Sequence, residues 1–94
     1  VPYFDVVGDG GLYSTVEDLA RWEANFLDPK VGGPEWLRLE QLRGRLTTGA
    51  TITYGAGLIH GTFRGDSIIE HGGSLGGYNT HFLRFPARRF ATVV

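Results

Sequence analysis

The sequence predicts an α+β fold in which two helices precede an antiparallel sheet of about four strands. Two observations support this prediction. Apolar residues recur at helical spacing up to about residue 46, and after residue 50 short β-prone segments alternate with glycine-rich turns. At 94 residues the chain is one domain at most, and its 41% hydrophobic and 13% aromatic content is typical of a globular protein.

The first helix is predicted over about residues 15–27. Ser14 and Glu17 stand at the spacing of a capping box, in which each side chain accepts a hydrogen bond from a backbone N–H at the helix start. Asp18 adds negative charge near the positive end of the helix dipole. The apolar face that follows consists of Val16, Leu19, Ala20, Trp22, Phe26 and Leu27. Asp28-Pro29 ends the helix.

The second helix is predicted to begin at Pro34, because proline is favoured in the first turn of a helix. Its apolar stripe consists of Trp36, Leu37, Leu39, Leu42 and Leu46. Gly44 weakens the end of this helix, and residues 47–49 close it.

The strands follow. Residues 51–59 are predicted to form a strand interrupted by glycines, residues 63–66 a hairpin turn, and Ser67–Glu70 a short buried strand. Residues 78–85 form the next strand, and a turn at 86–88 leads into the last one, at 89–94.

Charge and composition exclude several classes of function. Nine Lys and Arg residues balance ten Asp and Glu residues, which predicts no nucleic-acid partner. No apolar run is long enough for a membrane span, no signal peptide is visible, and the absence of cysteine excludes disulfides and thiolate metal sites. The sequence has no P-loop and no dinucleotide fingerprint, so we assign no cofactor.

The stretch His71-Gly-Gly-Ser-Leu-Gly-Gly77 is the strongest candidate for chemistry. Residues 72–76 match the G-x-S-x-G motif of the α/β-hydrolases, in which a strand enters the serine turn and a helix leaves it. Here the residues after Gly77 are β-prone, and no Asp…His order follows. We therefore do not expect the Ser74 hydroxyl to be a nucleophile.

The three histidines, His60, His71 and His81, are a weaker candidate for a metal site. None of them stands at helical i, i+4 spacing, and no H-E-x-x-H motif occurs. The sequence therefore predicts no metal.

Three stretches, taken in order, resemble the C-terminal part of the serine β-lactamase-like family. They are residues 10–22 (GGLYSTVEDLARW), 54–58 (YGAGL) and 71–77 (HGGSLGG). The family includes class C β-lactamases, penicillin-binding D,D-peptidases, related esterases and D-aminopeptidases. The resemblance covers nearly the whole chain and implies that residues 1–94 are a single partial domain, the C-terminal portion of a β-lactamase-like fold.

The resemblance also implies site residues. His71-Gly72-Gly73 would be the family's third motif, a strand-borne Lys-Thr-Gly or His-x-Gly that lines the cleft. His71 would offer a donor or a cation to a substrate carboxylate or a relay hydroxyl, and Gly72 and Gly73 would let substrate backbone lie along the strand. Ser74 would contribute its backbone N–H to an oxyanion hole. The predicted catalytic residues are thus His71 and the Ser74 N–H, and the substrate-binding residues are Gly72 and Gly73.

The family's other two motifs are missing from the chain. Ser-x-x-Lys needs a lysine, but three residues before the only one, Lys30, stands Leu27. Tyr-x-Asn is absent as well. The chain also lacks an initiator Met, and we expect it to be an excerpt from a longer serine hydrolase whose nucleophile lies upstream of Val1.

These expectations extend to activity, partners and location. The excerpt alone should be inactive, and it should self-associate or be only marginally stable. The parent would act on a small-molecule or peptide substrate by an acyl-enzyme route, in the bacterial periplasm or outside the cell as is plausible for the family. The alternative is a non-catalytic family member or a small α+β binding module.

Overall fold

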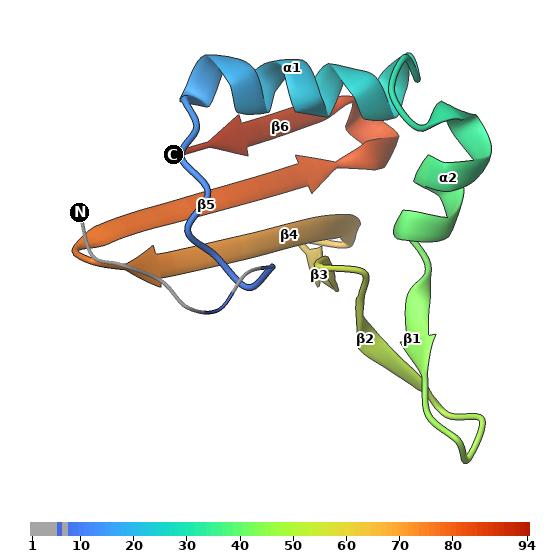
Figure 1. Cartoon of the computed structure of the whole chain (residues 1–94). Helices are drawn as coiled ribbons and strands as arrows, with labels where there is room; N and C mark the ends of the chain where they lie inside the picture. Colours follow the sequence, from blue (N-terminus) through green and yellow to red (C-terminus); the bar gives the residue numbers. More distant parts are fainter. Residues whose placement is uncertain (1–5, 7) are drawn as a thin grey trace.

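The computed structural model describes residue 6 and residues 8–94, and within them it has two helices and six strands. In chain order the elements are α1 (Val16–Leu27), α2 (Gly33–Glu40), β1 (Arg43–Arg45), β2 (Thr51–Gly55), β3 (Ile59–Phe63), β4 (Asp66–Leu75), β5 (Tyr78–Phe85), a 3₁₀ turn (Pro86–Arg88) and β6 (Phe90–Val93). All neighbouring strands pair antiparallel, in the order of the sequence. Figure 1 shows α1 beside β6 and β5, with α2 near one end of the sheet. The predicted α+β class is confirmed.

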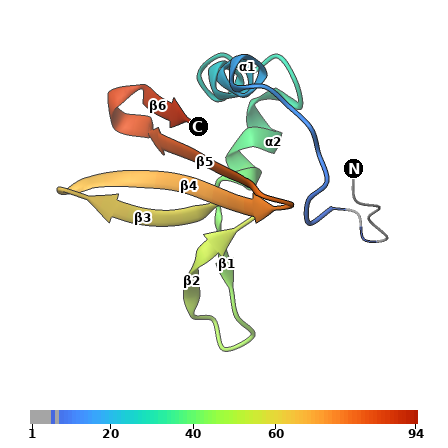
Figure 2. The same ribbon diagram turned by 90° about the vertical axis from the view of Figure 1, so that its left-hand side faces the viewer.

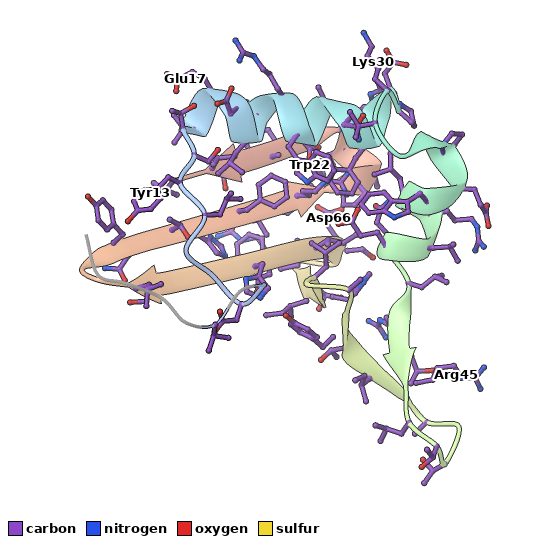
Figure 3. The ribbon with its side chains drawn as sticks, viewed as in Figure 1. Tyr13, Glu17, Trp22, Lys30, Arg45 and Asp66 are labelled. Atoms are coloured by element: carbon purple, nitrogen blue, oxygen red, sulfur yellow. The ribbon has the colours of Figure 1, made fainter. Side chains whose placement is uncertain are left out.

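The first helix has the predicted extent but a different cap. Thr15, with extended backbone angles, is the N-cap residue, and its hydroxyl accepts a hydrogen bond of 3.1 Å from the backbone N–H of Asp18. The capping box predicted for Ser14 and Glu17 is therefore wrong: the cap lies one residue later, and the carboxylate of Asp18 accepts a hydrogen bond from Arg21. Glu17 and Lys30 extend away from the sheet, whereas Trp22 lies on the side of α1 that faces it (Figure 3).

The second helix is shorter than predicted, because it ends at Glu40 and the next residues form β1. Leu42 and Leu46, which the helical spacing placed in its apolar stripe, are about half exposed. Gly44 lies inside β1, where an added Cβ would come within 2.8 Å of the carbonyl oxygen of Tyr54. A strand without a side chain at this position can approach β2 closely, and this accounts for the extra pairing.

The sheet has six strands where about four were predicted. The strand predicted over residues 51–59 is two strands, β2 and β3, separated by a turn with Gly57 at φ +74°. Figure 1 shows β1 and β2 as an arm that extends away from the other strands, and one register pair, Tyr54 with Ile59, joins this arm to β3. The tight turn between β3 and β4, with Arg64 and Gly65 both at positive φ, lies within the predicted hairpin turn.

Side chains on the two faces of the sheet have different surroundings. The side chain of Arg84 bonds Glu23 on α1, so it lies on the face of the sheet that the helices cover. Ile69 is opposite Arg84 in the β4–β5 register and therefore points to the same face. Alternation along β4 puts His71 on this face as well, and Glu70 and Gly72 on the opposite, outer face. Figure 2 shows the helices on one side of β4, β5 and β6 only.

The core is small. Leu37, Leu58 and Ile69 are the buried apolar side chains among the described residues. No helix in residues 8–94 is long and apolar enough to cross a membrane.

Candidate functional site at the free edge of β4

The strand that carries the candidate motif is longer than predicted. β4 runs from Asp66 to Leu75, so His71 lies inside the strand and not at the end of a strand closing at Glu70. Gly76 and Gly77, both with positive φ, make the turn into β5. Gly72 and Gly73 therefore belong to the strand, and of the residues between the two predicted strands only Gly76 and Gly77 form a turn.

β4 continues past its neighbour β3. The last register pair between these strands joins Ile59 to Glu70, whereas the pairing with β5 continues to Leu75 and Tyr78. Among the residues that the structure describes, β4 therefore has a partner on one side only from His71 onward. An unpaired strand edge presents N–H and C=O groups that another extended chain can bind.

The ladder on the other side shows which backbone groups face this edge. His81 exchanges two backbone hydrogen bonds with Val94, of 3.0 and 2.9 Å, so its own N–H and C=O point away from β4. Gly72 is opposite His81 and therefore belongs to a non-hydrogen-bonded pair of the β4–β5 ladder. Alternation gives Ser74 the same orientation. The backbone groups of Gly72 and Ser74 face the unpaired edge, and no backbone bond from residues 8–94 outside the strand ladders reaches them.

His71 is exposed, and within the described part of the chain one side-chain hydrogen bond holds its ring. Its Nε2 lies 3.0 Å from the hydroxyl oxygen of Tyr54 on β2, and the two rings meet edge to face with centroids 5.9 Å apart. Tyr54 reaches His71 because it pairs with Ile59, next to the place where β3 stops covering β4. Tyr54 was not among the predicted site residues, although residues 54–58 are one of the three stretches that resemble the family.

Gly73 lies beside His71 on the same face of β4, at a position where Thr80 leaves no room for a side chain. A Cβ added there would lie 2.9 Å from the hydroxyl oxygen of Thr80 on β5, so a side chain would force Thr80 to move. Gly72 points to the outer face, where an added Cβ would make only ordinary contacts. The segment before α1 passes the far end of this face, because a Cβ on Gly10 would touch Leu75 at 3.5 Å.

The Ser74 hydroxyl is badly placed to act with His71. The two residues are three apart in one strand, so their side chains point to opposite faces of the sheet. The strand also leaves the motif through a hairpin into β5, whereas a nucleophile elbow continues into a helix. The backbone N–H of Ser74, and not its side chain, is the group that faces the open edge.

The three histidines are far from forming one cluster. Within the described part of the chain, no group of three or more His, Cys, Asp or Glu side chains could hold a metal ion. His81 lies on the outer face, with Nε2 3.1 Å from a carboxylate oxygen of Glu70. The Nε2 of His60 is buried and has no hydrogen-bond partner among the described residues. Burial lowers the pKa of His60, and the charge of Arg43 lowers it further.

Comparison with known proteins shows the family to which the chain belongs. The model of the family described as Beta-lactamase matches residues 1–94. A protein named D-aminopeptidase from Gluconobacter oxydans (strain 621H) is 32% identical over 93 residues, which are 93% of this chain but only 17% of that relative's length. No solved structure matches. With a family match over its whole length, the chain belongs to the Beta-lactamase family.

Proposed function

We propose that these residues form one wall of the active site of a serine hydrolase that cleaves amide, lactam or ester bonds through an acyl-enzyme. The observation that carries the proposal is the free edge of β4 beyond Glu70, with the exposed His71 at its start. In this proposal His71 binds a substrate carboxylate or a relay hydroxyl, and Gly72 and Gly73 provide the surface along which the substrate lies.

The free edge suits a peptide-like substrate. An extended acyl chain can add to an unpaired strand through backbone hydrogen bonds, and Gly72 offers both an N–H and a C=O in the right direction. The Ser74 N–H, two residues further on, points the same way. As an oxyanion donor it would contribute about 3 kcal/mol to lowering the barrier.

The nucleophile and its base have to come from other residues of the parent protein. The chain has no Ser-x-x-Lys and no Tyr-x-Asn, and it spans only 17% of the length of its D-aminopeptidase relative. We therefore expect residues 1–94 alone to hydrolyse neither a chromogenic cephalosporin nor a p-nitrophenyl ester. Turnover that disappears in Ser74→Ala would instead assign the nucleophile to Ser74.

The relative suggests the first substrates to test. Because it is named a D-aminopeptidase, amides and short peptides with an N-terminal D-amino acid are the first class, followed by a β-lactam and a simple ester. All three react with a serine nucleophile through an acyl-enzyme, and they differ in the leaving group.

The experiment is intact-mass spectrometry of the full-length protein after brief incubation with each substrate. A mass increase equal to the acyl group, located by peptide mapping on a serine outside residues 1–94, is the expected result. Saturable binding of a substrate without acylation or turnover would favour a non-catalytic family member. Acylation of a residue within 1–94 would overturn the proposal that the nucleophile lies outside these residues.

A further inference from the structure

Tyr54 and His71 form a side-chain pair in which strands on both sides fix the backbone of Tyr54, and β5 fixes that of His71. Tyr54 lies between β1 and β3, in register with Ile59. Its carbonyl oxygen is so near Gly44 that a Cβ there would come within 2.8 Å, and a Cβ on Gly55 would lie 2.2 Å from the carbonyl oxygen of Leu42. Such close packing leaves the end of β2 little freedom, so the hydroxyl of Tyr54 is held at a defined place beside β4.

The chemistry of the two groups determines the direction of their hydrogen bond. A phenol, with a pKa near 10, is a good donor, and neutral imidazole, whose conjugate acid has a pKa near 6.5, is a good acceptor. The reverse bond would join a weaker acid, the neutral imidazole N–H, to a weaker base, the phenol oxygen. With the atoms 3.0 Å apart, these acidities favour donation from the O–H of Tyr54 to Nε2 of neutral His71 over the reverse bond.

We propose that Tyr54 is a positioning residue that holds neutral His71 in the tautomer with its proton on Nδ1. In this tautomer Nε2 is occupied as an acceptor and Nδ1–H is the available donor. No hydrogen bond to Nδ1 occurs among residues 8–94, so this N–H is free for a ligand. His71 then serves as a donor to a carbonyl or carboxylate oxygen and not as a base through Nε2.

The catalytic meaning of this pair rests on the proposed function, whereas the tautomer itself does not. A ligand with a carbonyl or carboxylate oxygen near the start of the free edge would receive the Nδ1–H bond. Loss of the Tyr54 hydroxyl would release the ring to rotate and to exchange its proton between the two nitrogens. The result would be a site with the same residues but a poorly directed donor.

The test is magic-angle-spinning NMR of the full-length protein labelled with ¹⁵N only in histidine, at a pH where the imidazole is neutral. The His71 signals are identified by their loss in His71→Gln. We expect the Nδ1–H tautomer to predominate, and Tyr54→Phe to shift the tautomer ratio towards Nε2–H by about two- to tenfold, the effect of one hydrogen bond. Tyr78→Phe, the same chemical change at an exposed tyrosine without a hydrogen bond to His71, should leave the ratio unchanged.

A second measurement, the chemical reactivity of His71, depends only on its hydrogen bond with Tyr54. Diethyl pyrocarbonate acylates neutral imidazole, and peptide mass spectrometry gives a separate rate for each histidine. His71 should react several times faster in Tyr54→Phe than in wild type, while His60 and His81 keep their rates as internal references for an intact fold.

An Nε2–H tautomer in wild type, or an unchanged ratio and unchanged His71 reactivity in Tyr54→Phe, would overturn the inference. Neither readout needs activity. A protein that shows the expected tautomer but forms no acyl-enzyme would keep this inference and refute the proposed function.

Discussion

Arg84 and Glu23, 61 positions apart in the sequence, form an ion pair between β5 and α1 that is almost closed to solvent. Arg84 is 2% exposed, donates a second hydrogen bond of 2.9 Å to Gln41, and stacks 4.0 Å from the ring centroid of Phe26. A single guanidinium thus joins the sheet to α1 and to the end of α2. In a domain with so few buried apolar side chains, this polar contact is a main determinant of how the helices sit on the sheet.

Removal of one partner should therefore be costly. In Glu23→Ala the buried guanidinium loses the carboxylate to which it is hydrogen-bonded, and we expect the free energy of unfolding to fall by about 3 kcal/mol. Asp18→Ala, which breaks the exposed pair with Arg21 on the same helix, should cost less than about 1 kcal/mol. Urea unfolding followed by circular dichroism measures both, and equal losses in the two variants would show that the buried pair has no special role.

The sequence predicts the elements whose signals are local. The amphipathic segment of α1 and the turn residues Arg64 and Gly65 carry their own conformational preference, and both were located correctly. β1 was missed because its pairing depends on close contact between Gly44 and β2, which no local pattern of residues 41–46 reports. Leu42 and Leu46 continued the helical spacing and concealed the change.

The site was predicted only in part, because some of its features also depend on contacts between distant segments of the chain. The family resemblance named His71 and the glycines beside it, but the extension of β4 past β3 depends on where β3 stops, at Ile59. Tyr54 was missed because its contact with His71 crosses from β2 to β4, 17 positions away. Arg84, which in sequence belongs to a basic group with Arg88 and Arg89, is an interior residue and contributes nothing to a basic surface.

Asn25 should be essential for the loop after α1. Its buried side-chain amide accepts hydrogen bonds from the backbone N–H groups of Lys30 and Val31, of 2.8 and 2.9 Å, and donates one of 3.0 Å to the Val31 carbonyl. Asn25→Ala leaves these groups without partners and should cost about 1–3 kcal/mol. Hydrogen exchange at Lys30 and Val31 should quicken, whereas Asn79→Ala, at an exposed position of β5, should change neither stability nor exchange.

His60 should make stability depend on pH. Burial, and then the charge of Arg43, lower its pKa in the folded state, so the unfolded chain binds the proton more readily. Its contribution to stability is complete above about pH 6.5 and is lost as the pH falls through the lowered folded pKa. His60→Gln cannot take up the proton and should lose less stability than wild type between about pH 7.5 and about pH 5.5.

Glu40 has the opposite effect on the pH dependence of stability. Burial raises its pKa in the folded state, so its contribution to stability is lost as the pH rises. It is present in both proteins, so its effect cancels in their difference. Urea unfolding at the two pH values gives that difference. Parallel pH curves for wild type and His60→Gln would contradict the prediction, and Arg43→Gln should give an intermediate pH dependence.

His71→Ala should impair catalysis without unfolding the protein. His71 is exposed, so we expect the stability of the full-length protein to change by no more than about 0.5 kcal/mol. Loss of a positioned donor should lower kcat/KM by about 100-fold on any substrate that forms the acyl-enzyme. His81→Ala removes a histidine from the outer face of the sheet and is the matched control, expected to keep kcat/KM within about twofold. A similar loss in both variants would mean that His71 acts only through the fold.

The outer face of the sheet should drive self-association of the 94-residue chain. Phe63, Phe85 and Phe90 gather there with ring centroids 6.3 and 5.9 Å apart, and Phe63 and Phe90 are 52% and 54% exposed. A contiguous aromatic patch favours association in water, and the free edge of β4 offers a second route through strand pairing.

Sedimentation velocity at several concentrations should therefore show a rising sedimentation coefficient for the chain. Phe90→Ser, which removes one ring from the patch but leaves the β4 edge intact, should reduce association if the face is responsible. Unchanged association in this variant would point to the strand edge instead. A stable monomer at high micromolar concentration, with cooperative thermal unfolding, would refute both routes and would show that residues 1–94 are stable as a monomer, with their aromatic face open to solvent.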